Sequence, residues 1–371
     1  MKTIPANSMK RMQRGVTLVE LMVALLLGLL LTAGMIQVFA SNRVTYEFNQ
    51  GLSRIQENAR FALDHMAYTT RMAGYSGCLS DVAYYNNLET PNDFRDNIEN
   101  GLQGHNANGT SAGQTFVAAA ADPAPSANPG NWTPALPAEL NNSVVPGSDV
   151  LIVRSVAGTA QPLITPFSDS AQLFVAAPHD YANGEILVVT DCQKASIFQL
   201  TLSQPAGLGV NLVHSNAGSF VPGNDAPVWG PEQEYGLGSE VARLQTHAFY
   251  VGRGASGRPT LFQLRLQPLT ATIAGFNAEE LVEGVDSMQV RYGVDTDTNG
   301  AIDDWRTADT VGDWTRVLSA EVTLLARAAD EYGSETDAGV YNLGGVQFNP
   351  VDDRRLRQVF STTIGVRNRL P

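Results

Sequence analysis

Hydrophobic residues fill the chain from Val16 to Asn42, and Glu20 is the one ionisable side chain between them. An apolar helix of about 20 residues crosses the hydrocarbon core of a bilayer, so this stretch predicts a membrane-spanning helix. A carboxylate within such a span costs about 2.5–3.5 kcal/mol on insertion scales. We therefore expect Glu20 to pair with a positive charge on another chain, which would make the segment an assembly element as well as an anchor.

The hydrophobic pattern continues beyond Asn42, now with a helical period. Apolar residues recur at spacings of three and four, as on one face of an amphipathic helix. Gly74 and Gly77 are the expected stop signals. The sequence predicts one long helix whose second half packs on a sheet through ordinary core residues: Val44, Phe48, Leu52, Ile55, Ala59, Ala62, Met66 and Ala73.

The rest of the chain changes from a loop-like to a β-like pattern. Residues 78–147 are rich in Asn, Gly, Ala and Pro, which is typical of long loops with weak internal structure. From Asp149 onward, short runs of β-branched and alternating residues are separated by Gly, Pro and Asn. A long helix followed by an antiparallel sheet is an α+β arrangement.

The start of the apolar segment carries a recognisable processing motif. Basic residues precede Gly15, and Glu20 follows it at the beginning of the apolar run. Residues 15–24 resemble the class III signal of type IV pilins and pseudopilins, although Val16 stands where most members have Phe. The resemblance implies that a prepilin peptidase cleaves after Gly15, that Val16 becomes the N-methylated N-terminus, and that Glu20 acts in assembly. An uncleaved signal anchor is the alternative.

Later blocks of the sequence resemble the PilW family of minor pilins. They lie within residues 51–77, 192–198, 281–295 and 355–370. The resemblance implies the type IV pilin fold, in which a long N-terminal helix packs on an antiparallel β-sheet head with long loop insertions. The expected division is a leader (1–15), a transmembrane or filament-core half-helix (16–42), an amphipathic half-helix (43–77), a loop-rich insertion (78–147) and a β-rich periplasmic head (148–371).

The charge distribution indicates the topology. The chain has a formal net charge of −13, whereas the leader carries Lys2, Lys10, Arg11 and Arg14 and no acidic residue. By the positive-inside rule the leader stays in the cytoplasm and the head is exported to the periplasm. An acidic chain without a basic stripe is a poor binder of nucleic acid.

The chain has two cysteines, Cys78 and Cys192. In an oxidising periplasm we expect them to form a disulfide. Closing a loop of more than about 100 residues would stabilise the fold by about 4–5 kcal/mol in the chain-entropy model. Two unrelated buried thiols are the alternative.

An acidic loop near residue 300 is a candidate calcium site. Oxygen donors occupy loop positions 1, 3, 5 and 9, and Gly300 is at position 6, where an EF-hand loop turns. Position 12 is Arg306 rather than the bidentate glutamate, so the full motif fails. A hairpin turn is the alternative. The candidate ligands are Asp295, Asp297, Asn299 and Asp303.

Catalytic motifs are weak. Ser111 lies in a G-x-S-x-G pattern, but a nucleophile elbow needs a strand before it and a helix after it, and this stretch is in a predicted loop. The five histidines lack metal-ligand spacing. We therefore expect no enzymatic activity, and we expect surface or packing roles for His65, His105, His179, His214 and His247.

The resemblance implies a structural minor pilin that primes or joins type IV pilus assembly through its N-terminal helix. The resemblance implies contacts with other minor pilins, the major pilin, the prepilin peptidase, the inner-membrane assembly platform and a PilY-type tip adhesin. The expected location is the bacterial inner membrane, with a single pass, and then the pilus. The alternatives are a type II secretion minor pseudopilin of the GspJ kind and a membrane-anchored periplasmic hydrolase.

Overall fold

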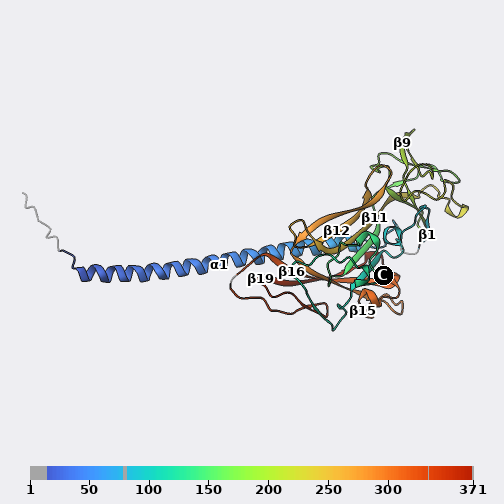
Figure 1. Cartoon of the computed structure of the whole chain (residues 1–371). Coiled ribbons are helices and arrows are strands. Elements are labelled where there is room, and N and C mark those ends of the chain that lie inside the picture. Colours follow the sequence, from blue (N-terminus) through green and yellow to red (C-terminus); the bar gives the residue numbers. More distant parts are fainter. Residues whose placement is uncertain (1–14, 78–81, 333, 370–371) are drawn as a thin grey trace, which may run out of the picture. The chain divides into compact units, whose positions relative to one another are not determined.

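A computed structural model describes residues 15–77, 82–332 and 334–369. The chain divides into two compact units, one ending at Gln50 and the other running from Gly51 to Pro371. Helix α1 (Leu18–Arg71) begins in the first unit and ends in the second. The predicted long helix is thus confirmed (Figure 1).

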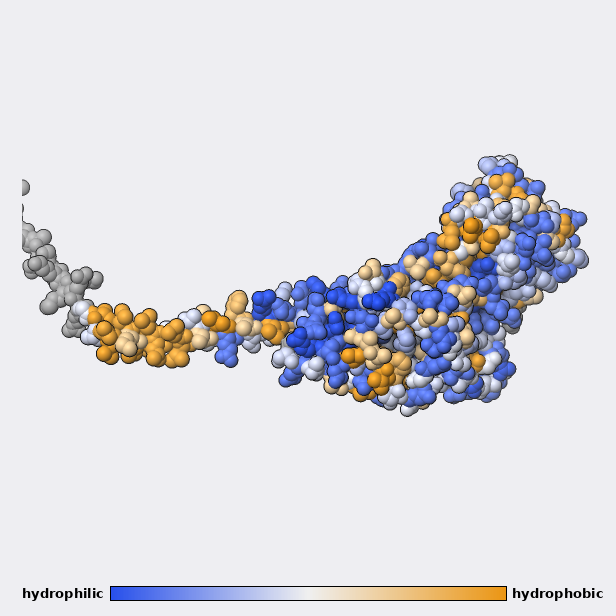
Figure 2. Space-filling view, in the orientation of Figure 1, coloured by the Kyte–Doolittle hydropathy of each residue, from blue (hydrophilic) through white to orange (hydrophobic). Residues whose placement is uncertain are grey.

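In the first unit, α1 is exposed along its whole length, and from Leu21 to Ala40 it is apolar on nearly all sides. Figure 2 shows the start of the helix as a hydrophobic surface that gives way to hydrophilic residues further along. The helix is long and apolar enough to cross a membrane. A helix that is hydrophobic all round requires burial in lipid or in protein, which agrees with the predicted anchor.

The second unit is built mainly from strands, with a few short helices between them. The short helices are α2 (Asp93–Asp96), η1 (Pro129–Asn131), η2 (Ala138–Leu140), η3 (Pro231–Gln233), η4 (Ala308–Thr310), η5 (Trp314–Arg316) and η6 (Arg367–Arg369). The strands are β1 (Ala83–Asn86), β2 (Leu102–Ala107), β3 (Thr115–Val117), β4 (Trp132–Thr133), β5 (Val150–Pro162), β6 (Gln172–Ala176), β7 (Ile186–Thr190), β8 (Lys194–Gln199), β9 (Leu202–Ala206), β10 (Gly209–Val213), β11 (Glu240–Arg253), β12 (Pro259–Pro268), β13 (Ala274–Glu283), β14 (Val285–Val294), β15 (Asp304–Arg306), β16 (Val317–Glu331), β17 (Tyr341–Leu343), β18 (Val346–Asn349) and β19 (Arg355–Gly365).

Two sheets carry most of the head. The nine-stranded sheet has the order β1-β8-β7-β11-β5-β2-β4, and β12 and β13 extend it from the other half of β11. The four-stranded sheet has the order β15-β14-β16-β19 and is antiparallel throughout. The smaller sheets are β6-β10-β9 and β17-β18-β3. Parallel pairs occur at β1–β8 and β3–β18, so the head is mixed rather than wholly antiparallel.

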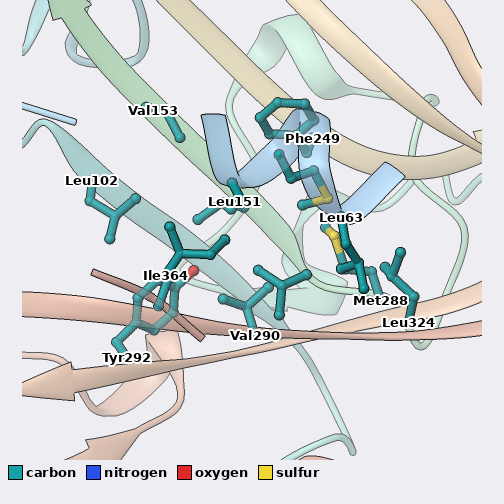
Figure 3. Packing of buried hydrophobic residues seen from close by; sticks show 14 of the residues in the cluster. Leu63, Leu102, Leu151, Val153, Phe249, Met288, Val290, Tyr292, Leu324 and Ile364 are labelled. Carbon is teal, nitrogen blue, oxygen red and sulfur yellow. The ribbon is translucent and has the colours of Figure 1, made fainter. Parts of the chain in front are cut away.

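The main core lies where both large sheets meet the second half of α1. Ala62, Leu63 and Met66 of the helix pack with buried residues of β2, β5, β11, β14, β16 and β19 (Figure 3). Ala62 and Met66 are fully buried. The predicted packing of the helical stripe is confirmed for Ile55, Ala59, Ala62, Met66 and Ala73. It is wrong for Val44 and Phe48, which are exposed because they precede the part of the helix that the sheets cover.

The end of α1 is fixed by glycine. The helix stops at Arg71, and Gly74 adopts a left-handed backbone with φ +70°. The N–H of Gly74 donates to the Arg154 carbonyl at 2.8 Å, which joins the helix end to β5. Gly101 approaches so closely that a Cβ there would lie 2.1 Å from the Gly74 nitrogen. The predicted stop signals are confirmed.

The expectation of weak internal structure in residues 78–147 is wrong. Strands β1, β2 and β4 all belong to the nine-stranded sheet, where β2 lies between β5 and β4. The sequence of β2 has little β propensity, and tertiary contacts select it instead. Leu102 is fully buried, and Gly104 leaves room for the Tyr292 hydroxyl, which would lie 1.9 Å from a Cβ at that position.

Candidate functional site

The processing region lies at the exposed start of α1. Gly15 and Val16 precede the helix, and both are exposed. Thr17 and Glu20 then bond reciprocally, because Glu20 Oε2 accepts from the Thr17 N–H at 2.9 Å and Thr17 Oγ1 accepts from the Glu20 N–H at 3.3 Å. This arrangement is a capping box, which satisfies backbone donors at a helix N-terminus.

The capping box gives Glu20 a local partner that the sequence analysis did not foresee. The signal was present as Thr17-Leu18-Val19-Glu20, the T-x-x-E pattern that precedes an apolar run. Because Val16 adjoins Thr17, the carboxylate that caps the helix lies one residue from the amine that cleavage after Gly15 would create. The Glu20 carboxylate would therefore be needed both to cap the helix and to neutralise an N-terminal amine.

The acidic loop joins β14 to β15 and brings three of its predicted ligands together. One carboxylate oxygen from each of Asp295, Asp297 and Asp303 lies within 4.8 Å of the other two. Backbone N–H groups fold the loop around Asp295: Gly300 donates to its Oδ2 at 2.8 Å, and Thr298 donates to its Oδ1 at 2.6 Å.

The fourth predicted ligand, Asn299, is turned to the loop itself. Its Oδ1 accepts from the Ala301 N–H at 2.7 Å, and its Nδ2 donates to Asp297 Oδ2 at 3.0 Å. At position 12, Arg306 pairs with Asp304 at 2.9 Å and offers no ligand. The residues present thus fit a hard cation through three carboxylates, with the rest of its coordination left to water or backbone oxygen.

Hydrogen bonds from the loop lower the pKa values of two of these carboxylates, Asp295 and Asp303. Desolvation raises the pKa of Asp295, but N–H donation from the loop backbone outweighs it and leaves the pKa below its usual value. Donation from the Thr296 backbone and hydroxyl likewise lowers the pKa of Asp303. Negative charge is therefore available at neutral pH, as cation binding requires.

Of the two cysteines of the predicted disulfide, Cys192 is among the described residues and Cys78 lies outside them. Cys192 occupies the turn between β7 and β8, with φ +71°. The segments on either side of Cys78 approach this turn: a Cβ at Gly77 would lie 3.3 Å from Thr190 Cγ2, and the Ala83 N–H donates to the Gln193 carbonyl. The bridge stays a prediction, and the neighbouring backbone supports it.

The surroundings of Ser111 differ from those of a hydrolase nucleophile. Ser111 lies in a turn between β2 and β3, and its N–H donates to Gln114 Oε1 at 3.0 Å. A short strand follows this turn where a nucleophile elbow would begin a helix. The G-x-S-x-G pattern is therefore a turn sequence here.

The histidines are distributed as packing residues. Gln263 bridges two of them: its Oε1 accepts from His65 Nε2 at 2.9 Å, and its Nε2 donates to His247 Nδ1 at 2.8 Å. The His214 ring stacks on Trp229 with centroids 4.3 Å apart, and neither ring nitrogen has a hydrogen-bond partner among the described residues. His105 and His179 contact the Pro134 carbonyl and the Ser203 hydroxyl.

Two family models match the chain. The model of the prokaryotic N-terminal methylation motif matches residues 10–36, which contain Gly15, Val16 and Glu20. The model of PilW, the type IV pilus-assembly protein W, matches residues 248–368. These two matches support a PilW-type type IV pilin. In this pilin the PilW match extends from the end of β11 to η6 and includes the four-stranded sheet and the acidic loop.

No curated protein and no solved structure matches the chain. The N-terminal signal and the exposed apolar helix of this PilW-type pilin are consistent with membrane anchoring and incorporation into a pilus. The two pilin-family matches point to a structural protein.

Acid should destabilise the pilin through two buried histidines. Burial lowers the pKa of His214 and of His247 to about 4. The unfolded chain binds these protons at about pH 6.5, so stability present above pH 6.5 is lost as the pH falls toward 4. We expect thermal melting of the detergent-solubilised protein to show this loss, and His214→Phe, which keeps the stacking on Trp229, to reduce it. An equal pH dependence in the variant would contradict the assignment.

Reduction should reveal the disulfide. If Cys78 and Cys192 are bridged, the native oxidised protein will take up no alkylating reagent, and the reduced, unfolded protein will take up two. Reductant should also lower the unfolding free energy by about 4–5 kcal/mol in the chain-entropy model. Intact mass and denaturant titration provide the two measurements. Two reactive thiols in unreduced, denatured protein would rule out the bridge.

Proposed function

We propose that this PilW-type pilin primes or joins assembly of a type IV pilus as a structural subunit, acting through its N-terminal helix. The observation that carries the proposal is the first half of α1, which is exposed, almost entirely apolar as far as Ala40, and largely contained in the methylation-motif match. Such a surface requires lipid before assembly and neighbouring helices afterwards.

Glu20 is the residue that would set the register between subunits. Cleavage after Gly15 leaves an α-ammonium on Val16, and two opposite charges in an apolar core satisfy one another where each alone would be costly. In the separate subunit, Glu20 caps its own helix through Thr17. In the filament it would turn to the amine of a neighbouring subunit, as the pilin family implies.

The same proposal specifies topology and partners. The basic leader would remain cytoplasmic, the helix would cross the inner membrane once, and the head would lie in the periplasm. A prepilin peptidase would process the chain before it meets the assembly platform, other minor pilins, the major pilin and a PilY-type adhesin. Type II secretion pseudopilins share the N-terminal features, and the PilW match of the head favours the pilus.

We also propose that calcium binds the loop of Asp295, Asp297 and Asp303. The support is the convergence of three carboxyl side chains in a loop already closed by backbone hydrogen bonds. Bound calcium would neutralise their mutual repulsion and rigidify the connection between β14 and β15.

Removing the Glu20 carboxylate should impair assembly and leave processing intact. We expect Glu20→Ala to be cleaved after Gly15, by mass spectrometry of the mature N-terminus, but to be depleted at least about tenfold from sheared pili, since about 1.4 kcal/mol already gives that factor. Glu47→Ala is the matched control, because Glu47 lies on the same helix and pairs only locally with Arg43. Wild-type amounts of the Glu20 variant in pili would refute the proposal.

Calcium should bind with millimolar or tighter affinity. Titration calorimetry of the solubilised protein should show one site, and calcium should raise the melting temperature relative to a chelator. Asp303→Asn should weaken binding, whereas Asp304→Asn should leave it unchanged, because Asp304 pairs with Arg306 outside the cluster. No heat of binding at millimolar calcium would exclude the site.

A further inference from the structure

Strand β19 forms an open edge of the four-stranded sheet. Among the described residues it pairs with β16 on one side and with no strand on the other. The Val366 N–H donates to the Leu318 carbonyl at 2.9 Å, which fixes the alternation of the ladder. Residues at even positions therefore bond to β16, and the backbone groups of Val359, Ser361 and Thr363 point outward.

This edge lacks the usual protection against pairing. Proteins block exposed edges with charges, proline or short strands. The edge strand β13 carries Glu279, Glu280 and Glu283, and the edge strand β9 contains Pro205. In β19 the run from residue 358 to residue 363 has no charge, proline or glycine.

A groove lies between this strand and α1. It has a volume of about 770 Å³ and is lined by Phe360 of β19 and by one flank of the helix, including Gln56, Glu57, Arg60, Phe61 and Asp64. Phe61 is 53% exposed, although it is a large aromatic side chain next to a well-packed core. The groove thus offers an aromatic contact beside a row of free backbone groups.

The charges of the groove are unpaired. Within the part of the chain that the structure describes, Glu57, Arg60 and Asp64 take part in no ion pair, whereas most arginines of the head do. Two acids face one base, so the groove favours a segment with a basic residue. The acidic edge strand β13 of a second copy would place like charges against Glu57 and Asp64.

We propose that an extended segment of a different pilus subunit binds here by adding as a strand to β19. Its backbone would bond to the outward groups of β19, an apolar side chain would contact Phe61 and Phe360, and a basic side chain would lie near Glu57 and Asp64. Strand addition of this kind takes affinity from main-chain hydrogen bonds and specificity from alternate side chains. This inference rests on the proposed function, because it names a partner and a contact for the same subunit.

The test is site-specific photo-cross-linking from position 61 in the full chain, in cells that assemble pili. We expect a cross-link to a strand of another pilin-type subunit, mapped by mass spectrometry. Thr363→Pro removes an outward N–H without removing a bond to β16. The proline variant should lower the yield of the cross-link by roughly tenfold, which is equivalent to the loss of one or two hydrogen bonds. Thr363→Val keeps the N–H and should retain the yield.

A second pair of variants guards against a folding defect in the proline variant. Glu57→Lys combined with Asp64→Lys reverses the groove charge at exposed helix positions and should also reduce the cross-link. Asn58→Lys is the control, since Asn58 is exposed on the same helix and outside the groove. Three outcomes would overturn the inference. The cross-link could join position 61 to a second copy or to a helix, or it could persist in both test variants. The third outcome is a protein that is present in sheared pili but forms no cross-link. Absence of the protein from the pili would instead contradict the proposed function.

Discussion

The contact that the head depends on is the burial of one face of α1 between two sheets. Small residues make this possible: Ala59 and Ala62 are fully buried, so strands of both sheets approach the helix backbone closely. Met66 fills the remaining space with a flexible side chain, a role that suits an irregular gap. A larger residue at either alanine would have to push a strand away, and with it the sheet order that creates the β19 edge and the acidic loop.

A buried carboxylate connects the two sheets independently of the helix. Asp149 accepts from the backbone N–H of Ala107 in β2 and of Val290 in β14, each at 2.9 Å, and its own N–H donates to the Met288 carbonyl. Three strands are thus held at one point where water is excluded, and unpaired backbone groups there would be expensive. The acidic loop begins directly after β14, so its base is held by this joint. The PilW-type head is therefore rigid close to the loop that would bind calcium.

The sequence predicts most reliably the features that depend on local residue patterns, and least reliably those that depend on pairing between distant strands. The long helix, its glycine stop and the processing motif follow from periodicity and from fixed residue types at Gly15 and Glu20. Strand β2 could not be predicted in this way, because Gly104 is chosen for the Tyr292 hydroxyl, which is distant in sequence. The acidic loop was visible as a spacing of carboxylates, but the inward use of Asn299 was not. The open edge of β19 is a property of sheet order, which no single strand encodes.

Two surfaces of this pilin lack a partner within the described residues: the exposed apolar half of α1, and the β19 edge with its groove. They would contribute to association in different ways. Association through the apolar half of α1 would be non-directional, because the free energy of hydrophobic burial scales with area and does not distinguish one apolar helix from another. The β19 edge and its groove are directional, because backbone hydrogen bonds require register and the unpaired charges require a matching partner. Subunits anchored in one membrane already meet at a raised effective concentration, so the second contact can be weak and still decide which neighbour is retained. Under the two proposals, anchoring through the helix and selection through the head would be separate functions of one chain, and α1 would take part in both because it also lines the groove.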